Sequence, residues 1–487
     1  MATDINSTNR VAHAKVREAV YGVTPANPAF KSLRVTSSTL NTNPQTVTSA
    51  EIRADRQVTD LNLVGTVAQG DIGMELSFGS GDDLFEESLQ GAWVSNPSIT
   101  VVTAGVEISA LSTTTVTVSA GGAAFVAGAM VLLQGFPTAA NNKRARVVSS
   151  TATTVVFAAA TFTAESLAIP VGAYIRQVGF QGAAGDLVAT ANGLTSTILN
   201  FTQMGIAVGE WLKFGGTPAG DKFAITPLNN DFVRISAVAV NALTFDRLPA
   251  GWAADAGTGQ TVAVFDGDYV RNGTNLISST IERQYQQQPS YEYLSGMCID
   301  KDSITVSAQK IVTRQISFIG RTGTIAATRF TGATDALPTN YQVVNASANV
   351  GRIAVNGSNI ASGNFVMEAT LNINNNLRPL EAVGTIGAIG IGNGEFTLTG
   401  TLNTYFADLT YYNLLLNNTA TSFDFRVGRA DGNKETLLFD LPRIKFSAGA
   451  PSVPGKNQNV MLPLSYQGLR DPVLGYTLQT TRWWYLE

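Results

Sequence analysis

A strict alternation of apolar and polar residues occurs twice in this chain. It covers residues 71–78, where every second residue is Ile, Met, Leu or Phe, and residues 395–403, where Phe and Leu alternate with Glu and Thr. A period of two is typical of a β-strand with one buried face. Each alternating segment is followed by apolar residues at helical spacing, in residues 80–93 and 405–418. The chain therefore contains the same strand-then-helix pattern twice.

The agreement between the two copies extends beyond these segments. Gly70 matches Gly394, an offset of 394 − 70 = 324. Residues 293–300 resemble residues 438–445, and in both copies a further strand follows that ends near a glycine. This match rests on the order of the elements more than on residue identity. It predicts an internal duplication.

The first copy is interrupted by a long insert rich in Gly, Ala, Thr and Val. The insert also repeats internally, since residues 125–135 resemble residues 206–216. Its short alternating runs predict two small all-β modules, each large enough to hold a core. We expect a mainly β fold with two antiparallel β-sandwich or β-barrel domains, each flanked by a short helix. The expected boundaries are 1–94 and 269–335 for the first domain, 95–182 and 183–268 for the inserted modules, and 336–487 for the second domain.

Composition excludes several function classes. Charged residues make up 14% of the chain, well below the ~25% of an average globular protein, so neither a disordered chain nor a coiled coil is expected. The single cysteine, Cys298, excludes an internal disulfide, and the single histidine, His13, has no partners spaced for a catalytic triad. The glycine-rich stretch 387–394 does not fit a phosphate-binding loop. We expect no enzymatic activity, no cofactor and no metal.

No apolar run approaches the ~18 residues of a membrane span, and no signal peptide is expected at the N-terminus. We therefore expect a protein that is made in the cytoplasm and does not contact a membrane. The net charge is −4, and residues 51–90 contain nine acids against two arginines. A solubilising surface is one interpretation, in which Glu86 and Glu87 form a solvated helix face. The other is a surface that repels a polyanion such as DNA.

Several segments, taken in order, carry a resemblance to a known family. They are residues 16–34, 48–57, 70–78, 82–86, 273–283, 376–379, 416–419 and 469–472. In this order they resemble the tail tube (major tail) proteins of long, non-contractile-tailed (siphovirus-type) bacteriophages. The insert at 95–268 departs from the pattern of that family.

The resemblance implies a structural virion protein whose tube domains form rings of six that stack around a lumen. Three copies with two tube domains each would complete a pseudo-sixfold ring, whereas a chain with one domain would need six copies. The tube would be a conduit for genome ejection, assembled in the host cytoplasm into the virion tail. Its expected partners are further copies of itself, the tape measure protein, and the tail terminator and distal tail proteins. Double-stranded DNA would pass without sticking.

The polar faces of the two matched strands make Asp71, Glu75 and Glu395 the candidates for an acidic lumen. The same faces could instead lie on the outside or against the helix. The N-terminal segment and residues 41–60 are long and polar, as arms that reach neighbouring rings would be.

Other functions remain open at this point. The chain could be a receptor-binding or decoration protein of the tail whose inserted modules bind host-surface glycans. A glycan-cleaving tail enzyme would need paired carboxylates beside aromatic platforms, and the sequence shows no such cluster.

Overall fold

Strands dominate the structure, so the expected mainly β fold is confirmed. The computed structural model describes residues 5–165, 167–338, 340–360, 364–429 and 431–487. In this part of the chain the α-helices are α1 (Asp82–Leu89) and α2 (Thr410–Leu416). Short 3-10 helices span Thr8–Arg10, Gly122–Ala124, Ala139–Asn141, Ala219–Asp221 and Pro227–Asn229.

The strands fall into three groups along the chain. The N-terminal unit holds β1 (Val11–Arg17), β2 (Ala29–Leu33), β3 (Ser37–Ser38), β4 (Asn41–Thr48), β5 (Leu61–Glu75), β19 (Asp268–Arg271), β20 (Ser279–Tyr285), β21 (Ser290–Ser307), β22 (Thr313–Gly320), β23 (Thr322–Ala326) and β24 (Thr334–Ala336). The C-terminal unit holds β25 (Val350–Val355), β26 (Ser358–Asn359), β27 (Val366–Asn374), β28 (Arg378–Leu380), β29 (Gly390–Gly392), β30 (Thr397–Tyr405), β31 (Thr421–Gly428), β32 (Thr436–Gly449), β33 (Met461–Gly468) and β34 (Gln479–Trp483). The insert holds β6 (Ser98–Thr100), β7 (Ile108–Leu111), β8 (Thr115–Val118), β9 (Ala129–Gln134), β10 (Arg144–Ser150), β11 (Thr154–Phe157), β12 (Tyr174–Gln181), β13 (Val188–Thr190), β14 (Gly193–Thr195), β15 (Trp211–Phe214), β16 (Phe232–Ala239), β17 (Ala242–Arg247) and β18 (Ala263–Phe265).

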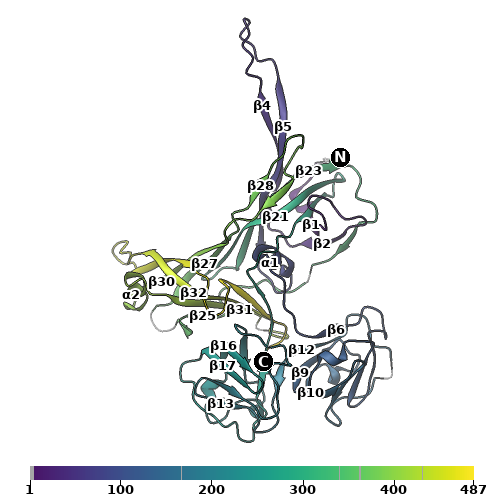
Figure 1. The fold of residues 1–487 in the computed structure, drawn as a ribbon, viewed down its shortest axis with the longest axis vertical. Helices are drawn as coiled ribbons and strands as arrows, with labels where there is room; N and C mark the ends of the chain where they lie inside the picture. Colours follow the sequence, from purple (N-terminus) through teal and green to yellow (C-terminus); the bar gives the residue numbers. More distant parts are fainter. Residues whose placement is uncertain (1–4, 166, 339, 361–363, 430) are drawn as a thin grey trace.

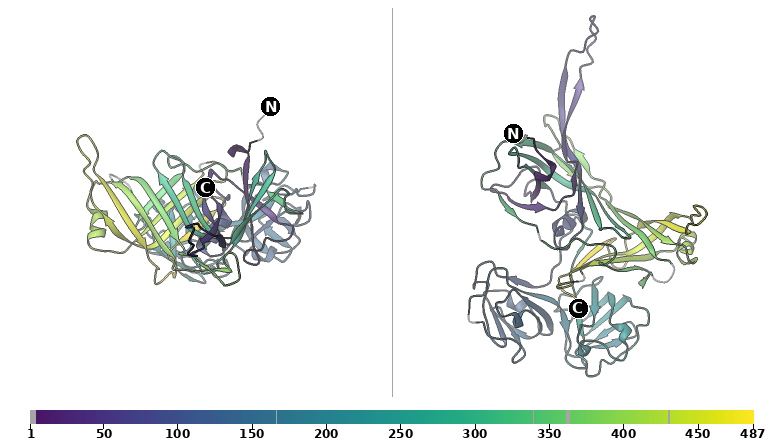
Figure 2. Two further views of the ribbon diagram at one scale, coloured as in Figure 1. Left: turned by 90° about the horizontal axis from the view of Figure 1, so that it is seen from above. Right: turned by 180° about the vertical axis from the view of Figure 1, so that it is seen from behind.

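The two units pair their strands in the same order. In the N-terminal unit the order is β2, β1, β20, β21, β22, β5, β4. In the C-terminal unit it is β26, β25, β31, β32, β33, β30, β27. The second half of β21 also pairs with β27, residues 301–307 against 368–374, so the two sheets run into one another. Figure 2 shows these strands side by side in one curved sheet.

The strand registers correct the offset expected from the sequence. Gln69 pairs with Ile319 as Thr399 pairs with Gln467, so the offset along β5 and β30 is 399 − 69 = 330. By this offset Gly70 corresponds to Gly400, and the expected match with Gly394 is wrong by six residues.

The two glycines occupy the same close approach to a neighbouring strand. A Cβ at Gly70 would lie 2.5 Å from the backbone oxygen of Thr39, and one at Gly400 would lie 2.1 Å from that of Thr370. Both positions therefore require glycine, because a side chain would collide with backbone.

The insert and the β4–β5 hairpin extend from opposite ends of the molecule (Figure 1). The hairpin projects as a long arm, and the shorter β28–β29 hairpin runs beside its base. In the insert, buried residues between 101 and 175 form one apolar cluster and those between 180 and 264 form another. The pairing of β12 with both β9 and β18 holds the two parts together.

Candidate functional site

The sheet formed by β5, β22, β21, β27, β30, β33 and β32 has one apolar and one polar face. The apolar face packs into the sandwich cores, with residues such as Ile72, Ile304 and Leu402 almost fully buried. The opposite face carries Ser, Thr, Asn and Gln and stays half-buried or exposed. This continuous polar face, called the polar sheet face below, is the candidate functional surface.

A row of hydroxyl groups crosses the polar sheet face at right angles to the strands. It begins at Glu75 on β5, which pairs with a threonine on β22. The hydroxyls of Thr370 and Thr401 lie 2.9 Å apart across β27 and β30. The row consists of Thr313, Thr305, Thr370, Thr401 and Ser465. Short hydroxyl side chains make this surface polar without making it charged.

Charges on the polar sheet face are few and of both signs. The acids are Asp71, Glu75 and Glu368, and the bases are Lys301 and Lys445. Asp71 accepts a hydrogen bond from the Gln315 amide at 3.1 Å, and Glu368 accepts one from Ser307 at 2.7 Å. Nothing here resembles the clustered Lys and Arg that neutralise phosphates.

The structure separates the three lumen candidates. Asp71 and Glu75 lie on β5 and point to the polar sheet face, opposite the buried Ile72 and Met74. Glu395 precedes β30 and is exposed in the loop after β29. The register offset explains the difference, because the residue that corresponds to Asp71 is Thr401, at 71 + 330.

Both ends of this sheet are unpaired edges. Among the described residues, β3 and β4 pair only with β5. At the other end, residues 445–449 of β32 pair only with β33. Unpaired edges present free N–H and C=O groups to another chain.

Asp83, Glu86 and Glu87 of α1 are paired inside the molecule, so the expected solvated face at Glu86 and Glu87 is wrong. The ammonium group of Lys15, 1% exposed, contacts the carboxylates of Glu87 and Asp83, the latter at 2.9 Å. Arg17 pairs with Glu86 at 2.6 Å. Burial alone would raise the pKa of Asp83, but Lys15 and Lys31 outweigh it and lower that pKa to about 2. The acids of α1 therefore hold the helix onto β1.

The single cysteine, Cys298, is fully buried, and the single histidine, His13, is half-buried. Burial, followed by the charges of Glu18 and Glu87, raises the pKa of the Cys298 thiol to about 12, so the thiolate that a nucleophile needs does not form. Burial and the neighbouring Arg283 lower the pKa of His13 to about 4. The described residues hold no cluster of three or more His, Cys, Asp or Glu that could bind a metal ion, and none of their helices could cross a membrane.

Comparison with known protein families decides the assignment. The family model described as "Phage tail tube protein" matches residues 8–468. The chain belongs to the phage tail tube protein family. The match spans the insert, the N-terminal unit and the C-terminal unit as far as the end of β33, and a search of curated proteins found no match. The tail tube protein therefore has a structural role in the virion tail, where it assembles with itself and other tail proteins into a tube.

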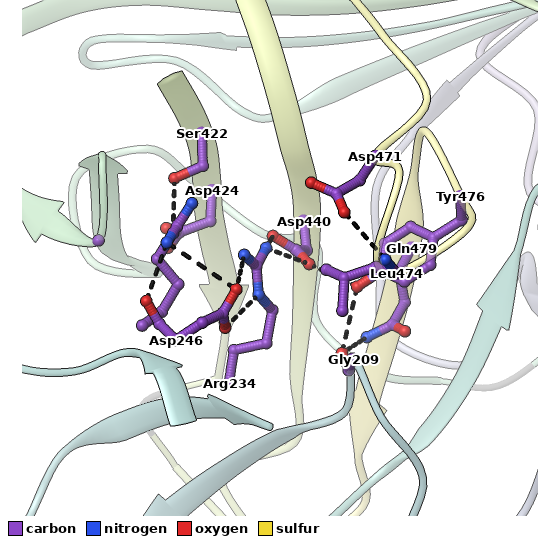
Figure 3. A network of polar contacts seen from close by, with 12 residues as sticks. Gly209, Arg234, Asp246, Ser422, Asp424, Asp440, Asp471, Leu474, Tyr476 and Gln479 are labelled. Atoms are coloured by element: carbon purple, nitrogen blue, oxygen red, sulfur yellow. Dashed lines mark hydrogen bonds and ion pairs between the residues drawn. The ribbon is translucent and has the colours of Figure 1, made fainter. Parts of the chain in front are cut away.

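In this tail tube protein a buried polar network joins the insert to the C-terminal unit (Figure 3). Arg234 of β16 is 1% exposed and contacts both carboxylate oxygens of Asp440 on β32, at 3.0 and 3.1 Å. Its other nitrogens donate to Asp246 at 3.0 and 2.7 Å, and Tyr476 donates to Asp440 at 2.9 Å. Apolar side chains from both sides pack around this network, among them Trp211, Phe232, Leu438 and Trp483.

No local sequence pattern indicates this contact, because Arg234 and Asp440 lie 206 positions apart. Trp483 belongs to the apolar contact between the insert and the C-terminal unit. It ends β34, and its ring lies 5.5 Å from that of Phe232 in the insert.

The two connections that enter and leave the insert form a buried polar neck. Val94 and Tyr269 bridge them, with backbone bonds of 2.8 and 3.0 Å. Asn96 donates through its backbone to Asp268 at 2.8 Å and through its side chain to Asp266 at 2.6 Å. Burial raises the pKa of Asp266 to about 7, although hydrogen bonds from Gln177 and Asn96 oppose the shift.

This neck should make stability depend on pH. The pKa of Asp266 rises from 3.8 to about 7 on folding, so the stability that the proton contributes is present in acid and lost as pH rises through 7. We expect Asp266→Asn to remove this loss. Relative to wild type, the variant should gain about 2–3 kcal/mol between pH 5 and pH 8, because each pKa unit is worth about 1.4 kcal/mol. Thermal unfolding at the two pH values measures the gain, and a difference that does not change with pH would contradict it.

Proposed function

We propose that three copies of this chain close into a ring with pseudo-sixfold symmetry, and that such rings stack into the tail tube of a siphovirus. The polar sheet face lines the lumen through which double-stranded DNA is ejected into the host. The N-terminal unit, residues 1–94 and 269–335, and the C-terminal unit, residues 336–487, act as two sibling tube domains. The modules 95–182 and 183–268 lie outside them. The observation that carries this proposal is the pairing of β21 with β27 inside one chain.

This pairing of β21 with β27, called the internal joint below, is a template for the strand pairing between neighbouring chains. Lys301 of β21 pairs with Ser317 of β22, and Ala448 of β32 pairs with Ser465 of β33. Because Ser317 and Ser465 occupy corresponding positions, Lys301 corresponds to Ala448, and the offset between β21 and β32 is 448 − 301 = 147. Both strands have an irregularity in register directly before this pair. The same comparison gives the offset between β3 and β27. Ser37 pairs with Gly73, and Glu368 pairs with Asn403, which is the counterpart of Gly73. Ser37 therefore corresponds to Glu368, an offset of 368 − 37 = 331.

Applied to the internal joint, these offsets give the register of the joint between chains. Residues 301–307 pair with 374–368 in the structure. The corresponding pairing between copies places residues 448–454 of one copy against residues 43–37 of the next. A ring built this way has no free sheet edge at the lumen wall, which removes the sites of uncontrolled strand pairing. Before assembly, Pro44 and Pro451 weaken both edges, because proline cannot donate a ladder hydrogen bond.

The two helices support the same arrangement. At the internal joint α1 is covered, and its Leu84, Phe85 and Leu89 are at most 2% exposed. The corresponding helix α2 has no buried residue, and Leu416 at its end is 63% exposed. The next copy would cover α2 as the C-terminal unit covers α1.

The two hairpins at one end supply surfaces for stacking. The β4–β5 arm exposes apolar side chains far from any core, among them Ile52 at 98%, Val58 at 72% and Leu61 at 61%. The β28–β29 hairpin does the same with Val383. Apolar residues on a projecting arm indicate contact with another copy, and these arms would reach the neighbouring ring.

The polar sheet face suits a channel for DNA. Asp71, Glu75 and Glu368 stand against basic residues such as Lys301 and Lys445, so the charges on this wall are few and of both signs. Tight binding of DNA needs many cationic contacts with phosphates. A weakly acidic wall of hydroxyls and amides would let DNA slide. The tape measure protein would occupy this lumen before ejection, and the terminator and distal tail proteins would close the two ends.

Electron microscopy of the protein purified from host cytoplasm tests this function. Hollow tubes or discrete rings with a central channel are expected. Compact trimers with projecting knobs and no channel would instead favour a receptor-binding or decoration protein.

A further inference from the structure

A cavity in the N-terminal unit lies beside the unpaired edge of β3. Its volume is about 470 Å³, and its walls come from β1, β3 and β20 and the segments next to them. Val11, Val35 and Tyr285 supply apolar wall, and His13 and Arg283 supply polar wall. Three buried polar atoms at this wall have no hydrogen-bond partner: His13 Nε2, Ser38 Oγ and Arg283 Nε. A cavity with unpartnered polar atoms is an incomplete site.

The corresponding place in the C-terminal unit is filled. There Val306 of β21 is 5% exposed and packs in one core cluster with Phe425 and Val427 of β31. Val306 pairs with Ala369 of β27. By the offset of 331, Ala369 corresponds to Ser38 at the cavity (369 − 331 = 38).

The residue that would fill the cavity can be found by the same arithmetic. By the offset of 147, Val306 corresponds to Val453 (306 + 147). Val453 follows β32 and is 77% exposed, although it is an apolar residue with a buried counterpart. Val453 cannot reach the cavity of its own chain, because Val453 and that cavity lie at opposite ends of the sheet.

We propose that Val453 of one copy inserts into the cavity lined by Val11, His13 and Ser38 of the next copy. This inference rests on the ring proposed above and names the side chain that locks one chain to the next. The segment around Val453 would bring backbone groups to the unpartnered atoms of His13 and Ser38. The contact would bury one isopropyl group at each contact between neighbouring copies, and burial of apolar surface stabilises such a contact.

The test compares three variants of the full chain. Val453→Asp should lower the fraction of protein that sediments as rings or tubes at least tenfold, because a carboxylate would be buried in the cavity. Its unfolding temperature as a monomer should not change, since the side chain is exposed there. Val453→Ile should assemble like wild type. Val102→Asp is the matched control, because Val102 is 72% exposed in the insert, and it should also assemble.

The outcomes separate this inference from the proposed function. Assembly of Val453→Asp at the wild-type level would overturn the insertion of Val453 and leave the ring intact. Equal loss of assembly in Val102→Asp would also overturn it, since the effect would then be one of added charge. A wild-type chain that forms no ring or tube would overturn the proposed function itself.

Discussion

Oxidation of the double variant Ala450→Cys/Asn41→Cys is expected to join assembled chains into covalent dimers and trimers. Inside one chain Ser303 pairs with Asn372, and the offsets of 147 and 331 convert this pair into Ala450 and Asn41 of adjacent copies. Opposed residues of antiparallel strands have Cα atoms about 4.5–5.5 Å apart, inside the range of about 4.4–6.8 Å that a disulfide needs. The native Cys298 is fully buried and does not compete.

Non-reducing electrophoresis of the oxidised tubes measures the result. The ladder should stop at three chains, because a closed ring of three has no further partner. In the control Ala450→Cys/Thr42→Cys the second cysteine faces the other side of the sheet, so little product is expected. Products of up to six chains would contradict the trimeric ring, and equal products from both pairs would contradict the register.

Removal of the carboxylate that joins insert and tube is expected to cause the largest loss of stability. Asp440→Ala leaves the guanidinium of Arg234 buried, with Asp246 as its remaining carboxylate partner among the described residues. Breaking a buried ion pair by removing one partner costs about 3–5 kcal/mol. Arg53→Ala breaks the pair with Asp55, whose side chains are 43% and 41% exposed, and should cost less than about 1 kcal/mol.

Calorimetry of the full chain distinguishes the two variants. Asp440→Ala should lower the unfolding temperature by about 5 °C or more, and Arg53→Ala by about 2 °C or less. A small effect at Asp440 would mean that the insert is not held by this network.

Sequence patterns predicted the strands better than the contacts between them. The alternation in residues 71–78 identified the buried face of β5, because period two reports directly on which side of a sheet is covered. The match between copies was anchored on the wrong glycine, since Gly394 and Gly400 both fit a weak pattern. The strand registers distinguish them, because they align Gly70 with Gly400.

The ionic contacts could not be predicted, because their partners are far apart in sequence. Lys15 lies 72 residues from Glu87. The sequence alone therefore indicated a solvated run of acids in α1, whereas in the folded protein β1 lies beside that helix and supplies their partners. Glu395 lies outside β30, which begins two residues later, at Thr397.

Cryo-electron microscopy of the assembled tube tests the central claim most directly. The rotational symmetry of one ring should be threefold, with two similar lobes for each chain and with β3 and β4 of each copy beside β32 of its neighbour. Exact sixfold symmetry, or rings whose wall does not contain the sheet from β5 to β32, would contradict the account.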